Sequence, residues 1–285
     1  MLLYKLNPED HEMVFKKRNS SEKPKAVGAP LGTASTGKTV RTKSIGDAQE
    51  LIPGDNHYRA YVGPPDRYDF MGATQFALLF HLGLRDRHTV LDFGCGSMRL
   101  GRLLIPYLQK GGYHGLDPNK WLIEEGLNKE LGDDAVRLKS PRFAHNDDFN
   151  CDVFNEKFDF IIAQSILTHT GVDLFKKFLE TAAACLKPNG LVLFTVLHNK
   201  DEALPLPPDG WLYPDCTIFH PKTVQNILGE SPLTGKLIPW YHKISYWYCA
   251  GFNEDMLPTD DQLQFLTGTV LRDEQLKASL KSRSP

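Results

Sequence analysis

The chain has 285 residues, of which 41% are hydrophobic and 24% are charged, and its formal net charge at pH 7 is -2. These values are typical of a globular protein with a sizeable core, and the near-neutral total argues against broad binding of nucleic acid through its phosphates. The length predicts one main domain with extensions.

The five cysteines are odd in number, widely spaced and without a C-x-x-C pair; they are Cys95, Cys151, Cys185, Cys216 and Cys249. This pattern predicts free thiols in a reducing compartment. The first residues hold an apolar run too short for the core of a signal peptide, and no later stretch reaches the roughly 20 apolar residues of a membrane span. We therefore expect a cytoplasmic protein that does not enter the membrane.

Residues 1–57 are predicted to form a flexible extension, because 16–43 is rich in Lys, Ser, Thr, Gly and Pro and shows no regular periodicity. Within it, Gly32 to Thr39 matches G-x-x-x-x-G-K-[ST], the phosphate-binding P-loop. A working P-loop lies between a buried strand and a helix, whereas here the preceding segment is proline-rich and the following one is polar. We therefore do not expect a nucleotide hydrolase.

The main domain is predicted to span 58–253, with a polar, helix-prone tail over 254–285. Strands and helices alternate in it at the short spacing of βαβ units. The first half predicts a buried helix around 76–80, a strand at 89–93, a helix with Leu100, Leu103, Leu104 and Leu108 on one face that Pro106 kinks or ends, a strand at 113–117, and a helix from an Asn119 N-cap to Leu131.

The second half continues the alternation. It predicts strands at 142–146 and 158–164, a helix at 173–186 stopped by a turn at 187–190, a nearly continuous apolar strand at 191–197, a proline-rich loop at 204–214, a helix near 221–228, and a hairpin of strands at 235–240 and 245–251. The fold class is therefore α/β and doubly wound.

A glycine turn follows the first strand of the main domain, in the sequence Leu91-Asp92-Phe93-Gly94-Cys95-Gly96. Glycine lets the backbone approach a ligand at the carboxyl edge of the strand. A dinucleotide site requires a third small residue, but Arg99 stands there. Asp92 also suits an ammonium group better than a pyrophosphate, so the loop favours S-adenosylmethionine.

The chain resembles class I S-adenosylmethionine-dependent methyltransferases over roughly 61–252. The first motif of that family is similar to VLDFGCG at 90–96, the second to GYHGLD at 112–117, the fourth to IAQS at 162–165, and the turn into the fifth strand to LKPNGL at 186–191. The resemblance implies a mostly parallel, seven-stranded sheet with a C-terminal antiparallel hairpin. The sequence departs from the common pattern at Met98, where many members carry a third glycine.

The resemblance also implies a set of cofactor-binding residues. Asp117, followed by Pro118, matches the acid that binds the ribose, and its spacing of 21 residues from Gly96 agrees with the general rule for such an acid. An acid after the third strand meets the adenine amino group, and Asp147 is slightly favoured over Asp148. The remaining positions of the set are Asp92, Gly94, Cys95, Gly96, Gln164 and Ser165.

Residues for the methyl acceptor are less sharply indicated. His169 follows the fourth strand at the edge where an acceptor lies, and it is the first candidate for a general base; packing or hydrogen bonding near the cofactor is an equal alternative. His198 and His242 are weaker candidates. Trp211 and Tyr213 lie in the loop after the fifth strand, where such folds line the acceptor pocket, although aromatic residues near strands usually pack in the core.

Tyr61 and Tyr68 could close over the cofactor, or could pack the N-terminal helix. No three histidines have the spacing of metal ligands, and no metal is expected. The sequence thus predicts an O-methyltransferase acting on a small-molecule or saccharide hydroxyl. One alternative is a protein or RNA methyltransferase that docks its substrate with the basic extension, and another is a non-catalytic cofactor-binding module.

Overall fold

The computed structural model describes residues 2–3, 16–17, 51–201 and 204–269. The P-loop match at 32–39, most of the predicted extension and the last part of the predicted tail, 270–285, lie outside these ranges. Strand β1 (Leu2–Leu3) pairs antiparallel with β2 (Lys16–Lys17), so the extension holds a short ladder where no strand was predicted. Within the described part, no helix combines the length and apolar character needed to span a bilayer.

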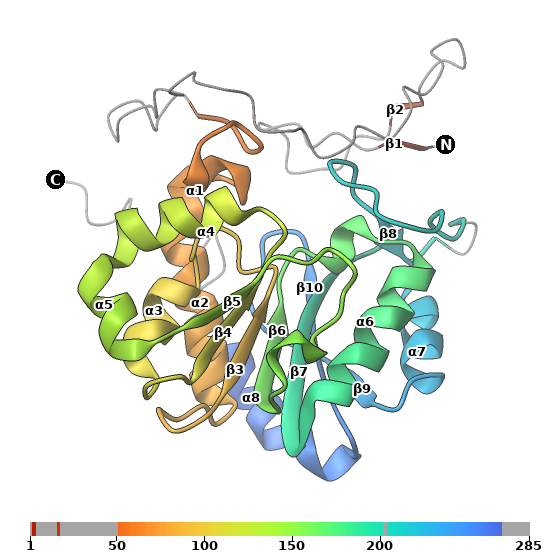
Figure 1. The fold of residues 1–285 in the computed structure, drawn as a ribbon. Coiled ribbons are helices and arrows are strands. Elements are labelled where there is room, and N and C mark those ends of the chain that lie inside the picture. The colour runs from red at the N-terminus through yellow and green to blue at the C-terminus, as the bar shows by residue number, and fades with distance from the viewer. Residues whose placement is uncertain (1, 4–15, 18–50, 202–203, 270–285) are drawn as a thin grey trace, which may run out of the picture.

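A mixed sheet forms the centre of the molecule (Figure 1). Its order is β5-β4-β3-β6-β7-β10-β9, with the short β8 (Ile218–Phe219) pairing with β7 off this path. The strands are β3 (Val90–Phe93), β4 (Tyr113–Leu116), β5 (Arg142–Ala144), β6 (Phe158–Ala163), β7 (Leu186–His198), β9 (Thr234–Ile238) and β10 (Tyr246–Gly251). Only β10 runs against its neighbours, so the predicted parallel sheet with an antiparallel C-terminal hairpin is confirmed.

Helices cover both faces of the sheet, as the apolar residues of each strand require. One core cluster joins the sheet to α2 (Tyr68–His81), α3 (Gly101–Tyr107), α4 (Lys120–Gly126) and α8 (Asp260–Thr269). The other joins it to α6 (Val172–Cys185) and α7 (Pro221–Gly229). The two groups of helices lie on opposite sides of the strands in Figure 1.

Three short helices lie around the carboxyl edge of the parallel strands, namely α1 (Tyr58–Tyr61), η2 (Pro65–Arg67) and η5 (Leu167–His169). Two others, η4 (Asp152–Phe154) before β6 and η6 (Glu254–Met256) after the antiparallel β10, lie at the opposite edge. The connection from β3 leads to β4 on one side, while β6 pairs with β3 on the other side. The strand order therefore reverses between β3 and β6, and ligands of doubly wound folds bind at such a point.

Several predicted boundaries were wrong. The helix predicted from Asn119 to Leu131 is α4 followed by a π-helical turn, η3 (Leu127–Leu131), and a separate helix α5 (Asp133–Lys139) that was not predicted. Asn119 holds the N-cap position, but its side chain makes no cap; its amide donates to Asp117 Oδ1 at 3.1 Å instead.

The predicted turn at 187–190 is part of β7, which begins directly after α6. The pairing with β6 shifts register between Phe158 and Phe160, and this irregularity accommodates the proline and glycine inside the strand. Pro106 lies inside α3, which ends one residue later, as predicted. All five cysteines are free, as their spacing predicted.

Candidate active site

The glycine turn connects β3 to α3 at the reversal of strand order. Gly94 and Gly96 have φ angles of 76° and 51°, a region that side chains disfavour. The turn is tied to β4, because the N–H groups of Gly94 and Cys95 donate to the carbonyl of Leu116 at 2.7 and 3.1 Å. The side chain of Cys95 is buried, so this residue can offer a ligand only its backbone.

Two apolar side chains lie directly against the glycines. A Cβ atom on Gly94 would stand 2.1 Å from Cδ1 of Ile166, and one on Gly96 would stand 2.7 Å from Cγ1 of Val62. The turn is therefore covered from the β6 side and from the segment after α1. A ligand that approaches the glycines must displace these side chains, and neither residue could be recognised from a sequence motif.

Asp117 ends β4 beside the turn. Its Oδ2 accepts the N–H of Gly96 at 3.0 Å, and its Oδ1 accepts the N–H of Asn119 at 2.8 Å. Burial raises the pKa of this carboxyl above its ordinary value, although the hydrogen bonds oppose the shift. A carboxylate has about four acceptor positions, so Asp117 keeps capacity for hydroxyl groups of a ligand. Pro118, next to it, is exposed.

Asp92, in β3 just before the turn, is buried rather than exposed at the surface. The hydroxyl of Tyr113 donates to Asp92 Oδ2 at 2.8 Å. Burial raises the pKa of Asp92 to about 7, while Tyr113 and the nearby Arg99 favour the charged form. The guanidinium of Arg99 donates to the carbonyl of Val62 at 2.7 Å. Arg99, which argued against a dinucleotide site, therefore holds the segment around Val62 that covers the turn.

The two acidic candidates after β5 differ in their surroundings. Asp148 accepts the Asn146 side-chain amide at 2.5 Å and the N–H of Asn150 at 3.0 Å, so it closes a local turn. These hydrogen bonds lower its pKa. Asp147 is exposed, and no hydrogen bond of its side chain is recorded among the described residues. Asp147 therefore keeps its carboxylate oxygens accessible, and its role toward the adenine stays a prediction.

Gln164 and Ser165 follow β6 on the other side of the reversal. Nδ1 of His242 accepts the N–H of Ser245 at 2.9 Å, so the neutral ring carries its proton on Nε2, which lies 3.3 Å from the side-chain amide of Gln164 and can donate to the oxygen of that amide. Burial lowers the pKa of His242 to about 3, and Arg99 adds to the shift. Ser165 donates its N–H to Thr195 Oγ1 at 2.8 Å. His242 is therefore a neutral, inward-facing group that contacts Gln164.

Two buried polar atoms around this edge have no partner among the described residues. They are Ser97 Oγ and Asn146 Oδ1. Buried polar atoms are almost always hydrogen-bonded in folded proteins, so such a group indicates a ligand that supplies the missing donors. The ammonium, ribose hydroxyls and adenine amino group of S-adenosylmethionine are donors, and the residues present fit this cofactor.

His169 lies in η5, directly after β6. Its Nδ1 is 2.8 Å from the backbone carbonyl of Asp215. A carbonyl only accepts, so Nδ1 carries the ring proton and Nε2 is left with a free electron pair. Burial lowers the pKa of His169, which keeps the ring neutral at pH 7. The histidine is thus in the protonation state that a general base requires.

The loop after β7 is fixed on η5 by backbone hydrogen bonds. Leu212 donates to the carbonyl of His169 at 2.7 Å, and Thr217 donates to that of Thr168 at 2.7 Å. This places the ring of His169 at 5.1 Å from Tyr213 and 6.1 Å from Trp211, measured between ring centroids. His169, Trp211 and Tyr213, which the sequence predicted to lie near the methyl acceptor, are therefore neighbours.

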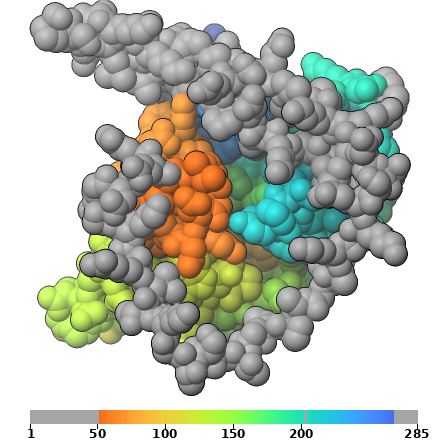
Figure 2. Space-filling model, turned by 90° about the horizontal axis from the view of Figure 1, so that it is seen from above, coloured from red at the N-terminus to blue at the C-terminus, as the bar shows by residue number. Residues whose placement is uncertain are grey.

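The N-terminal helices meet this loop over the edge of the sheet. Tyr61 of α1 lies 6.1 Å from Tyr213 and 5.3 Å from Trp121 of α4, between ring centroids. Figure 2 shows the orange N-terminal helices beside the cyan loop. Trp211 and Tyr213 are 46% and 39% exposed, so their faces are available to a ligand. Tyr61 belongs to this aromatic rim, whereas Tyr68 is buried and is no lid.

His198 lies apart from the other candidates. Its ring stacks on Tyr246 at 4.7 Å, and its Nε2 is 3.0 Å from the hydroxyl of Tyr248. It lines a cavity of about 850 Å³ between β7, β9, β10 and α7, to which Lys200 and Lys236 also contribute. Burial lowers the pKa of His198 to about 4. The structure thus separates His198 from the group around His169.

The order of strands, the glycine turn and the acid after the second parallel strand together define the fold of S-adenosylmethionine-dependent methyltransferases. A glycopeptide N-methyltransferase, MtfA, solved with S-adenosyl-L-methionine, is similar over 64% of this chain and 94% of its own, with 12% identity and a TM-score of 0.50. An S-adenosylmethionine-dependent methyltransferase from Clostridium acetobutylicum matches 65% of this chain and 91% of its own, with 16% identity and a TM-score of 0.49.

Magnesium protoporphyrin IX methyltransferase from Synechocystis, also solved with bound cofactor, matches over 64% of this chain and 81% of its own, with 17% identity and a TM-score of 0.47. A family model described as a methyltransferase domain matches residues 58–242, which is more than half of the chain. The chain belongs to this methyltransferase family. The predicted class of enzyme is thereby confirmed.

Proposed function

We propose that this enzyme transfers a methyl group from S-adenosylmethionine to a hydroxyl group of a small molecule or saccharide. The observation that carries the proposal is the state of His169, whose Nδ1 is bound to a backbone carbonyl while Nε2 is left to accept a proton at the carboxyl edge of β6. A hydroxyl acceptor, unlike a neutral amine, gains much from a base that removes its proton.

The cofactor contacts follow from the geometry of the turn. The backbone of 94–96 receives the methionine part, Asp117 receives the ribose hydroxyls, and Asp147 receives the adenine amino group. When bound, S-adenosylmethionine supplies a methyl group activated by the neighbouring sulfonium. Transfer is an in-line displacement, so the main task of the protein is to align the acceptor oxygen with that methyl group.

The acceptor is held by the aromatic rim and activated by His169. Trp211 and Tyr213 offer exposed faces on which a sugar or a flat ring can stack. As the acceptor oxygen forms its bond to the methyl carbon, the hydroxyl proton passes to Nε2 of His169. The two weaker candidates from the sequence have no part in this proposal, because His198 lines a separate cavity and His242 is buried against Gln164.

The experiment measures release of S-adenosylhomocysteine with a panel of phenols, methyl glycosides and primary amines, for the wild type and His169→Asn. The asparagine amide can still donate to the Asp215 carbonyl but has no base at the position of Nε2. We expect turnover of a hydroxyl acceptor to fall about 100-fold, with unchanged affinity for S-adenosylhomocysteine. Turnover of amines alone, or full activity of the variant, would contradict the proposal.

A further inference from the structure

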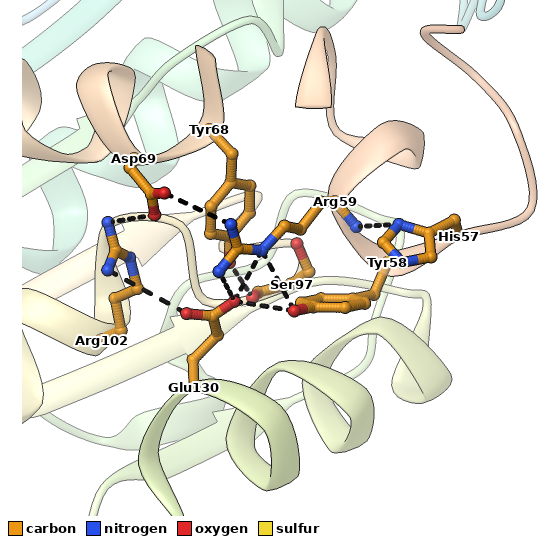
Figure 3. A network of polar contacts seen from close by, with 8 residues as sticks. All are labelled: His57, Tyr58, Arg59, Tyr68, Asp69, Ser97, Arg102 and Glu130. Atoms are coloured by element: carbon orange, nitrogen blue, oxygen red, sulfur yellow. Dashed lines mark hydrogen bonds and ion pairs between the residues drawn. The ribbon is translucent and has the colours of Figure 1, made fainter. Parts of the chain in front are cut away.

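Tyr68 connects the first long helix to the glycine turn. It opens α2 and is 1% exposed, and its hydroxyl donates to the backbone carbonyl of Ser97 at 2.5 Å. Figure 3 shows the phenol reaching Ser97 from the side of α2. Ser97 directly follows the turn at 94–96, so the hydrogen bond holds the peptide group that leads out of the turn.

The same peptide group is enclosed from a second helix. A Cβ atom on Gly126 of α4 would lie 2.3 Å from the Ser97 carbonyl oxygen, so α4 packs directly on this oxygen. The next residue, Met98, is fully buried and has a φ angle of 67°. A non-glycine residue in this region is strained and persists only when its surroundings hold it. The peptide between Ser97 and Met98 is therefore strained and held in place.

Charged side chains fix the ring of Tyr68 independently of the turn. The guanidinium carbon atoms of Arg59 and Arg102 lie 4.6 and 5.6 Å from the ring centroid. Glu130, whose side chain is 7% exposed, binds Arg59 at 2.6 Å, and Asp69 binds Arg102 at 2.9 Å. Figure 3 shows the two acids holding the two guanidinium groups around the phenol. The ring of Tyr68 therefore keeps its place even if the backbone of the turn moves.

We propose that Tyr68 is a positioning residue, which holds the strained peptide after Ser97 and so fixes the turn that receives the methionine part of the cofactor. The inference rests on the proposed cofactor site, and Tyr68 itself touches no cofactor. Without the hydroxyl, the buried Ser97 carbonyl loses its donor and Met98 can relax toward ordinary φ angles. The backbone of 94–96, which receives the methionine part, then loses its fixed position.

The test compares two ligands by calorimetry. S-adenosylhomocysteine contains the amino acid part, whereas 5′-methylthioadenosine lacks it and depends on Asp117 rather than on the turn. Tyr68→Phe keeps the ring between the arginines and removes only the hydroxyl. We expect its dissociation constant to rise about tenfold for S-adenosylhomocysteine and less than twofold for 5′-methylthioadenosine. The matched control is Tyr107→Phe, which removes a hydroxyl that donates to Leu84 at 3.4 Å and should change neither constant.

A second substitution tests the strain. Glycine adopts positive φ freely, so Tyr68→Phe introduced into Met98→Gly should change the affinity for S-adenosylhomocysteine less than it does in the wild type, even if single variants lose stability. Equal weakening of both ligands, or identical effects in the two backgrounds, would overturn the role of Tyr68. Failure of the folded wild type to bind S-adenosylhomocysteine would instead overturn the cofactor site.

Discussion

At the scale of single residues, the contacts of a buried histidine determine whether it can act as a base. His169 and His242 both have lowered pKa values, but their contacts differ. His169 contacts the exposed rings of Trp211 and Tyr213, whereas His242 is engaged on Nδ1 by a backbone N–H and on Nε2 by Gln164. The same residue type thus serves as a candidate base in one place and as a packing partner in the other.

The pH dependence of turnover follows from His169. Burial disfavours the imidazolium, so the neutral ring that accepts the proton dominates at pH 7, and activity is lost as the pH falls through a midpoint below 6.5. Initial rates between pH 5 and 9 at saturating cofactor should show a plateau on the neutral side. A rate that keeps rising above pH 8 would assign the proton transfer to another group.

The raised pKa of Asp92 predicts that cofactor binding releases a proton. Its pKa of about 7 means that about half of the free protein carries a proton on this carboxyl at pH 7. If the cofactor ammonium lies above Asp92, it favours the charged form, and binding releases up to about half a proton at pH 7 and almost none at pH 9. Calorimetry in phosphate and in Tris buffer measures this number. Asp92→Asn is the control, and a binding enthalpy independent of buffer would leave Asp92 as a partner of Tyr113 only.

At the scale of elements, the strands were easier to predict than the helices. The parallel strands β3, β6 and the main part of β7 are buried on both faces, so their apolar runs stand out in the sequence. Helix α5 has no buried residue, which left no periodic pattern to find. The start of β7 was missed because proline and glycine usually end an element, while here a register shift absorbs them.

The candidate site also has a part that the sequence could predict and a part that it could not. The turn at 94–96 and Asp117 were predictable because local spacing defines them. Val62, Ile166 and Tyr68 were not assigned to the turn, because each reaches it only through the tertiary fold. The contact from Tyr68 to Ser97 joins residues 29 positions apart, and neither residue belongs to a motif.

The packing of α4 on the turn gives a stability prediction. Gly126→Ala places a Cβ 2.3 Å from the Ser97 carbonyl oxygen, so α4 must move away. We expect the free energy of unfolding in urea to fall by about 1–3 kcal/mol. Gly229→Ala at the end of α7 is the control, because a Cβ there meets nothing within 4 Å, and it should be neutral or slightly stabilising. Equal effects of the two substitutions would contradict the close packing.

At the scale of the whole molecule, the reversal of strand order between β3 and β6 gathers the site. Segments far apart in the sequence meet there: helices α1 and α2 lie on one side of the site, and the loop after β7 lies on the other. Charges are balanced overall, so recognition depends on local groups rather than on a long-range field. We therefore propose that the cofactor binds at the strand ends and the acceptor at the aromatic rim.

The central claim is that this edge binds S-adenosylmethionine through Asp117. Calorimetry with S-adenosylhomocysteine and with NAD, on the wild type and on Asp117→Asn, tests it most directly, since the substitution keeps the shape of the side chain and removes its charge. We expect S-adenosylhomocysteine to bind one site of the wild type at least tenfold more tightly than it binds the variant, and NAD not to bind. Binding of NAD in its place, or equal affinity of the two proteins for S-adenosylhomocysteine, would contradict the account.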